Sequence, residues 1–129
     1  IPILMKKQII ITPLAPAPIG PYNQAVKAND TLYISGQIPI VPASMELFHG
    51  TIEEETELVM QNLKSILEAA EMSFEQVVKT SIFLSDMENF GKVNEVYGRY
   101  FEDKTAPARE TVAVKTLPKS VRIDLDSEL

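Results

Sequence analysis

The spacing of apolar residues along the chain predicts two helices. Between Glu53 and Glu71 the apolar positions recur at the spacing of one helix face, and they are Val59, Leu63, Ile66, Leu67 and Ala70. Thr51 followed by Glu54 is a capping-box pattern at the start of this helix. A second apolar stripe predicts a helix over Asn89–Asp103, which its two glycines weaken by about 1 kcal/mol each relative to alanine.

Alternating and β-branched stretches predict six strands. They are Gln8–Ile11, Ala25–Ala28, Thr31–Ile38, Val77–Leu84, Thr111–Leu117 and Val121–Leu125. Asn29 and Asp30 tolerate the positive φ of a tight turn, so the second and third strands form a hairpin. A turn through Pro118-Lys119-Ser120 joins the last two strands, and a proline-rich extended segment separates the first two.

This order of elements predicts an α+β fold, with a single mixed β-sheet and two helices packed on one face. In the strand Val77–Leu84, alternation places Val77, Ser81 and Phe83 on one face and Val78, Ile82 and Leu84 on the other. Apolar residues therefore occur on both faces, although two helices can cover only one. We expect the uncovered face to pack against other copies of the chain.

Composition and charge narrow the classes of function. The 129 residues suffice for one domain, and a net charge of −6 argues against general nucleic-acid binding. The sequence has no cysteine and one histidine, His49, so disulfides, thiol nucleophiles, cysteine metal sites and two-histidine ribonuclease sites are excluded. No stretch approaches the ~18 apolar residues of a membrane span. We expect a cytoplasmic protein whose domain covers 5–129, with 1–4 a remnant before a natural start at Met5.

Four segments carry a family resemblance when they are taken together and in order. They are Pro18-Ile-Gly-Pro-Tyr-Asn-Gln-Ala25, Leu32-Tyr-Ile-Ser-Gly-Gln-Ile-Pro39, Asp86-Met-Glu-Asn-Phe90 with Val93-Asn-Glu-Val-Tyr97, and Ala106-Pro-Ala-Arg-Glu-Thr-Val112 with Leu117-Pro-Lys119. The pattern resembles the RidA (YjgF) family of imine deaminases, also called endoribonuclease L-PSP, over nearly the whole chain. The resemblance implies a homotrimer with one substrate cleft between neighbouring subunits, and no cofactor or metal.

Arg109 and Thr111 are the first candidate site residues. A guanidinium can clamp a carboxylate through two parallel hydrogen bonds, although a lone arginine is more often a solvated surface residue. Thr111 follows by two positions and shares its face of the strand. The resemblance implies that Arg109 binds the substrate carboxylate and that Thr111 lies near the bound acid. Phe90 and Asn94 match family positions near the cleft. Core packing would also explain Phe90, and the polar surface of a helix would also explain Asn94.

Asp124 is the candidate for directing water. It lies in a strictly alternating strand, and the family typically has the longer glutamate at the matching position. The alternative is a polar residue on the outer strand face. Ser35 and Gly36 interrupt a strand, which is typical of a bulge or a close backbone approach, and the resemblance implies that they contact substrate. Tyr22 follows a turn that could hold its ring over the same pocket.

The resemblance therefore implies hydrolysis of 2-imino acids, such as 2-iminobutanoate and 2-iminopropanoate, or of their enamine tautomers, to 2-oxo acids and ammonia. Arg109 would anchor the carboxylate and Asp124 would orient water, with Thr111 or Tyr22 assisting. Two alternatives stay open. One is an endoribonuclease or translation inhibitor, and the other is a non-enzymatic binder of small carboxylates or a chaperone-like protein.

Overall fold

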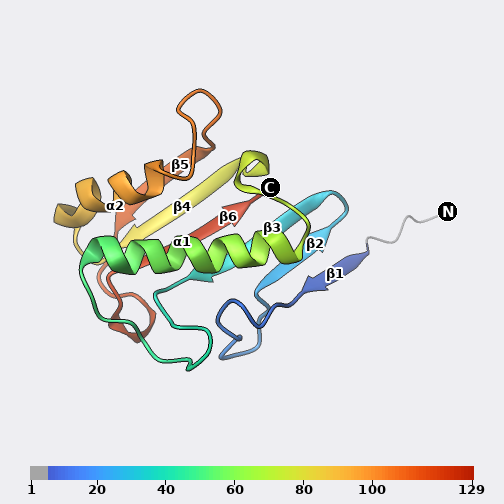
Figure 1. Cartoon of the computed structure of the whole chain (residues 1–129), viewed down its shortest axis with the longest axis horizontal. Helices are drawn as coiled ribbons and strands as arrows, with labels where there is room; N and C mark the ends of the chain where they lie inside the picture. Colours follow the sequence, from blue (N-terminus) through green and yellow to red (C-terminus); the bar gives the residue numbers. More distant parts are fainter. Residues whose placement is uncertain (1–5) are drawn as a thin grey trace.

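The computed structural model describes residues 6–129, which form a six-stranded sheet and two helices (Figure 1). The strands are β1 (Lys7–Ile10), β2 (Ala25–Ala28), β3 (Thr31–Gln37), β4 (Lys79–Leu84), β5 (Ala108–Ala113) and β6 (Ile123–Glu128). Their order across the sheet is β1-β2-β3-β6-β4-β5. Only β4 and β5 pair in parallel among these neighbours, so the sheet is mixed, as predicted. The expectation for residues 1–4 and Met5 lies outside the described residues.

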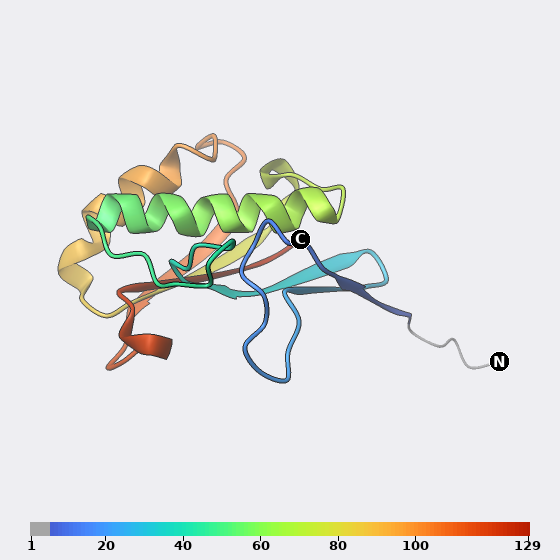
Figure 2. The same ribbon diagram turned by 60° about the horizontal axis from the view of Figure 1, so that its bottom comes forward.

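Both helices, α1 (Ile52–Ala69) and α2 (Phe90–Gly98), lie on the same face of the sheet (Figure 2). This confirms the predicted α+β arrangement. The core lies between α1 and the central strands, where Leu63, Ile66, Leu32, Ile82 and Leu125 are at most 1% exposed. The capping box is present, because Thr51 Oγ1 accepts from the Glu54 amide and the Glu54 carboxylate accepts from the Thr51 amide.

The structure corrects several predicted boundaries. The second helix ends at Gly98 rather than Asp103, because the chain turns after the glycine and the C-cap is Arg99. The fifth strand begins earlier than Thr111, since it pairs along the full length of β4. The last strand begins at Ile123 rather than Val121, because Val121 still caps the 3-10 turn Pro118–Ser120 and pairing with β4 starts only at Ile123, opposite Leu84.

The prediction for Val77 and Val78 is wrong. Val77 is buried in the core at 3% exposure, whereas Val78 is 61% exposed. Regular alternation begins only at Lys79, because Val77 still caps the preceding 3-10 turn Phe74–Gln76 (η1). From Thr80 onward the alternation holds, with Ile82 in the core under the helices.

The face of the sheet opposite the helices is called the open face here. Strand register places Tyr33, Phe83 and Val112 on it, because Tyr33 is opposite Glu128 and Phe83 is opposite both Val112 and Asp124. Tyr33 is 48% exposed and Val112 is 41% exposed. The open face therefore carries partly exposed aromatic and aliphatic side chains.

Within residues 6–129, no helix is long and apolar enough to cross a membrane.

Candidate active site

The predicted site residues form two separate groups, and each group holds four of them. The Arg109 group consists of Arg109, Thr111, Phe90 and Asn94, at the packing of α2 against the edge strand β5. The Asp124 group consists of Asp124, Tyr22, Ser35 and Gly36, where β6 meets the bulged end of β3. One chain does not bring the two groups together.

Arg109 is held by α2 from two directions. Its Nη1 donates a hydrogen bond to Asn94 Oδ1 at 2.6 Å. Its guanidinium lies over the rings of Tyr97 and Phe90, with Cζ 5.0 and 5.5 Å from their centroids. One hydrogen bond and two ring contacts fix the plane of the guanidinium. Its remaining N–H groups have no partner among residues 6–129 and can bind a planar anion such as a carboxylate.

Tyr97 also belongs to this group, although the sequence did not single it out as a candidate site residue. Its hydroxyl hydrogen-bonds to Thr80 at 2.8 Å while its ring supports Arg109. Burial raises the pKa of Tyr97, against the opposing effects of the Thr80 hydrogen bond and the Arg109 charge. Tyr97 therefore stays neutral and acts as a platform rather than as an acid or base.

Thr111 lies on the same sheet face as Arg109, as predicted from their spacing. Its hydroxyl oxygen is buried and has no hydrogen-bond partner among residues 6–129. A buried hydroxyl without a partner costs free energy, so such an atom in a site is a candidate for contact with substrate or water.

Asp124 is packed against Gly36, and the two positions depend on each other. The register of β3 and β6 shifts between Ile34 and Gln37, which places Ser35 and Gly36 in an irregularity of the strand. A Cβ at Gly36 would lie only 2.3 Å from Oδ1 of Asp124. A side chain at this position would force the Asp124 carboxylate to move, because the carboxylate occupies the space that a Cβ would fill.

The environment of Asp124 favours its neutral form. Its pKa is raised from 3.8 to about 6, first by burial and then by the negative charge of Asp126, against the effect of a hydrogen bond from the Leu125 backbone. Oδ1 is buried and has no hydrogen-bond partner among residues 6–129. A carboxyl group with a pKa near neutrality can take up and return a proton at physiological pH.

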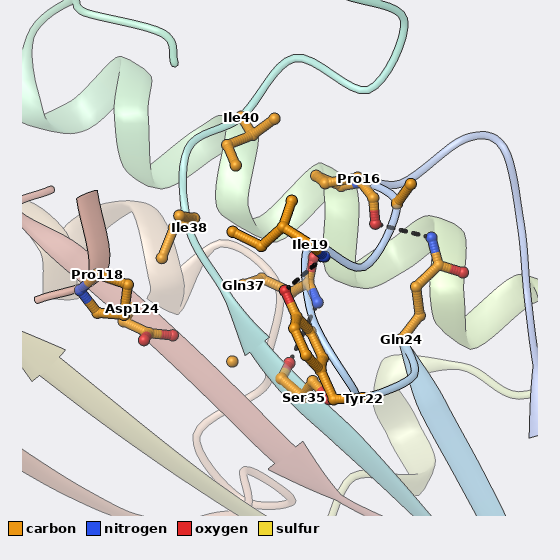
Figure 3. A pocket seen from close by; sticks show the side chains of 12 residues that line it. Pro16, Ile19, Tyr22, Gln24, Ser35, Gln37, Ile38, Ile40, Pro118 and Asp124 are labelled. Atoms are coloured by element: carbon orange, nitrogen blue, oxygen red, sulfur yellow. Dashed lines mark hydrogen bonds between the residues drawn. The ribbon is translucent and has the colours of Figure 1, made fainter. Parts of the chain in front are cut away.

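Ser35 and Tyr22 complete the second group. Ser35 Oγ donates to the Asn23 carbonyl at 2.6 Å and so ties β3 to the segment before β2. The Tyr22 hydroxyl accepts from the Ile19 amide at 3.3 Å, and its side chain is 46% exposed. All four members of the Asp124 group line one cavity of about 400 Å³ (Figure 3).

Strand register shows that the two groups lie on opposite faces of the sheet. Arg109 is opposite Thr80 on β4, and Thr80 is buried beneath α2, whereas Asp124 is opposite Phe83 on the open face. Successive residues of β4 point to opposite faces, so Arg109 and Asp124 project in opposite directions. Within one chain these two side chains do not share a site.

His49 lies outside both groups. It lines a separate cavity of about 210 Å³ beside the ion pair of Arg122 and Glu55. Among residues 6–129, no group of three or more histidine, aspartate or glutamate side chains is placed to hold a metal ion.

Comparison with known proteins relates the chain to one family over almost its full length. The family model "Endoribonuclease L-PSP" matches residues 12–127. A RutC family protein of Pyrococcus horikoshii is 48% identical over 121 residues, covering 94% of this chain and 95% of that protein. The 2-iminobutanoate/2-iminopropanoate deaminase of Mus musculus is 44% identical over 121 residues, covering 94% and 89%. A crystal structure from Thermotoga maritima, described as a candidate endoribonuclease, superimposes with a TM-score of 0.91 at 50% identity, covering 94% of each chain.

Proposed function

The chain belongs to the endoribonuclease L-PSP (RidA) family, and on that premise we propose that it hydrolyses 2-imino acids to 2-oxo acids and ammonia. The proposal rests on one observation: the two groups together supply a carboxylate-binding side chain and a proton-accepting side chain. One holds a preorganised guanidinium suited to a carboxylate, and the other a half-buried carboxyl group whose pKa is raised to about 6. The mouse relative bears the name of this activity.

The reaction needs one water molecule and no redox change. In the proposed mechanism Arg109 binds the substrate carboxylate through two N–H groups, while ionised Asp124 accepts a proton from water as its oxygen attacks C2 of the protonated imine. The C–N double bond becomes a single bond in a tetrahedral aminoalcohol. Asp124 then returns that proton to the nitrogen. The C–N bond breaks as the hydroxyl group becomes the carbonyl of the 2-oxo acid and gives its proton to Asp124. Ammonia leaves and takes up this last proton as ammonium, which regenerates ionised Asp124.

The site requires a second copy of the chain, because Arg109 and Asp124 project from opposite faces of the sheet. We propose that the Arg109 group of one protomer faces the Asp124 group of its neighbour. Such a contact joins two different surfaces, and it closes only as a ring. A homotrimer is the ring that the family resemblance implies, and the exposed Tyr33 and Val112 of the open face are consistent with a surface that another copy covers.

A coupled assay tests the activity. A threonine dehydratase generates 2-iminobutanoate, and semicarbazide traps whatever imine this protein has not hydrolysed. We expect the wild type to reduce the trapped product and Arg109→Ala to abolish that effect with unchanged circular dichroism. If the wild type does not lower trapping, the imine hydrolase proposal is wrong. RNA cleavage that survives Arg109→Ala after fresh purification would instead favour the endoribonuclease.

Mixing two inactive variants tests the shared site. Arg109→Ala and Asp124→Asn protomers are co-refolded in equal amounts, so that some clefts combine the intact Arg109 of one chain with the intact Asp124 of the next. Random mixing restores about a quarter of the wild-type sites in a closed ring. No recovery of activity above the separate variants would contradict a cleft between protomers. Light scattering on the wild type, expected near three times 14.4 kDa, gives the number of copies.

A further inference from the structure

The cavity beside Asp124 has an apolar wall that the proposed chemistry does not use. Ile19, Ile38, Ile40 and Pro16 line it together with Pro118. In Figure 3, Ile38, Ile40 and Ile19 gather on the side of the cavity away from Ser35. A volume of about 400 Å³ exceeds what an imino acid with a methyl or ethyl side chain needs. The cavity therefore offers apolar space next to the reacting groups.

Part of this wall has no regular secondary structure of its own. Pro16 and Ile19 belong to the proline-rich segment between β1 and β2, which lacks a strand or helix to hold it. Prolines restrict this backbone but supply no N–H groups for its hydrogen bonds. Another group must therefore satisfy the carbonyls of the segment and fix its path.

Gln24, which is 3% exposed, supplies those hydrogen bonds. Its Nε2 donates to the carbonyls of Thr12, Ala15 and Pro16 at 2.9, 3.1 and 2.9 Å. Its Oε1 accepts from the Thr12 amide at 2.8 Å. One buried side chain thus replaces the backbone pairing that the segment lacks, and it sets where Pro16 stands in the cavity (Figure 3).

We propose that this apolar wall receives the substrate side chain, so that the enzyme prefers 2-imino acids with uncharged aliphatic side chains longer than ethyl, and that Gln24 is the positioning residue for the wall. The inference rests on the proposed function and deepens it. Asp124 and its neighbour Asp126 disfavour acidic side chains at the same place through their negative charge. Each methylene buried against the wall raises affinity about fourfold.

The test compares imines with side chains of one to four carbons, generated in place from the corresponding amino acids by an amino-acid oxidase with catalase present. We expect kcat/KM to rise about fourfold per methylene from 2-iminopropanoate to 2-iminohexanoate in the wild type. Equal kcat/KM across the series would overturn the proposal, and so would a fall with length, which would mean that a neighbouring protomer fills the cavity.

Variants separate a positioning role from a merely structural one. Gln24→Glu keeps the shape but loses the donors that hold the carbonyls, and we expect the ratio of kcat/KM for the longest and shortest substrates to fall at least about tenfold. Ile19→Ala, at a position 55% exposed, should lower the same ratio without a risk to folding. Gln8→Glu, on the exposed edge strand β1, is the matched control and should leave the ratio unchanged. Equal proportional losses on every substrate in both variants would contradict the proposal.

Binding of the 2-oxo acid series by calorimetry keeps the two proposals distinguishable. If the wild type hydrolyses no imine, the proposed function fails, but a rise in affinity with side-chain length would still support the apolar wall. If the wild type hydrolyses imines while affinity does not depend on length, only the inference about the wall fails.

Discussion

Replacing Asp124 with asparagine is expected to stabilise the folded protein at neutral pH. The pKa of Asp124 is raised from 3.8 to about 6, so the folded state binds the proton more tightly than the unfolded chain does. A shift of about two pH units corresponds to about 3 kcal/mol once the group is ionised in both states. Because the carboxyl group is only partly buried and solvent screens it, we expect asparagine to gain about 1–2 kcal/mol at pH 7.5.

Because the pKa of Asp124 is raised on folding, the stability gain of Asp124→Asn is confined to a defined pH range. Below pH 3.8 the carboxyl group is protonated in both states, and the asparagine variant has no electrostatic advantage. The cost of ionisation develops as the pH rises from about 4 and is complete above about 6. Urea unfolding between pH 4 and pH 8, with equal m-values as a requirement, measures the difference.

Asp103→Asn, at an exposed turn after α2, is the control and should show no stability gain that grows with pH. An Asp124→Asn variant that is no more stable than the wild type at pH 7.5 would refute the reasoning. So would a gain that is the same at pH 4 and pH 8, because it would then come from packing rather than from ionisation.

Four further outcomes are expected. The wild-type kcat/KM should fall below about pH 6 as Asp124 is protonated, and a flat pH profile would remove its role as a base. Gly36→Ala places a Cβ where the carboxylate lies and should cost about a hundredfold in kcat, measured with matched circular dichroism. Arg109→Lys should recover little of the activity lost in Arg109→Ala, since an ammonium cannot form the bidentate pair; near-native turnover would contradict the clamp. Arg122→Met leaves buried Glu55 unpaired and should lower the unfolding free energy by about 3 kcal/mol, which adding Glu55→Gln should largely restore.

Short sequence patterns predicted helix starts and turns correctly where a single side chain determines the local backbone conformation. Thr51 and Glu54 placed the start of α1, and Asn29, which adopts a φ of 55°, placed the hairpin turn. Patterns failed where a distant partner decides. Glu55 is one of three acidic residues in the first turn of α1, where the helix dipole alone would account for it. Its carboxylate is nevertheless buried against Arg122, 67 residues further along the chain. No spacing rule connects two such positions.

Gln24 shows the same limit in the candidate site. It belongs to a segment that carried the family resemblance, but its amide gives no chemical signal in the sequence. Its importance follows from three carbonyls that converge on it in the fold, and these belong to residues 8 to 12 positions earlier. A signal was nevertheless present, because a run of prolines that must stay close to the sheet requires donors from elsewhere. The sequence predicts the need for such donors, and only the structure identifies the residue that supplies them.

The pairing register of β5 and β6 with β4 alone decides that Arg109 and Asp124 lie on opposite faces of the sheet. Alternation in the sequence places Arg109 and Thr111 on one face of their strand, but it does not show how that strand and the strand of Asp124 are aligned relative to each other. Both β5 and β6 pair with β4, with Arg109 opposite Thr80 and Asp124 opposite Phe83. A shift of one residue in either pairing would bring Arg109 and Asp124 to the same face and make a site within one chain conceivable. With the observed register, one chain cannot place both side chains on one substrate. The proposed chemistry therefore requires the proposed assembly, and the mixing experiment tests both.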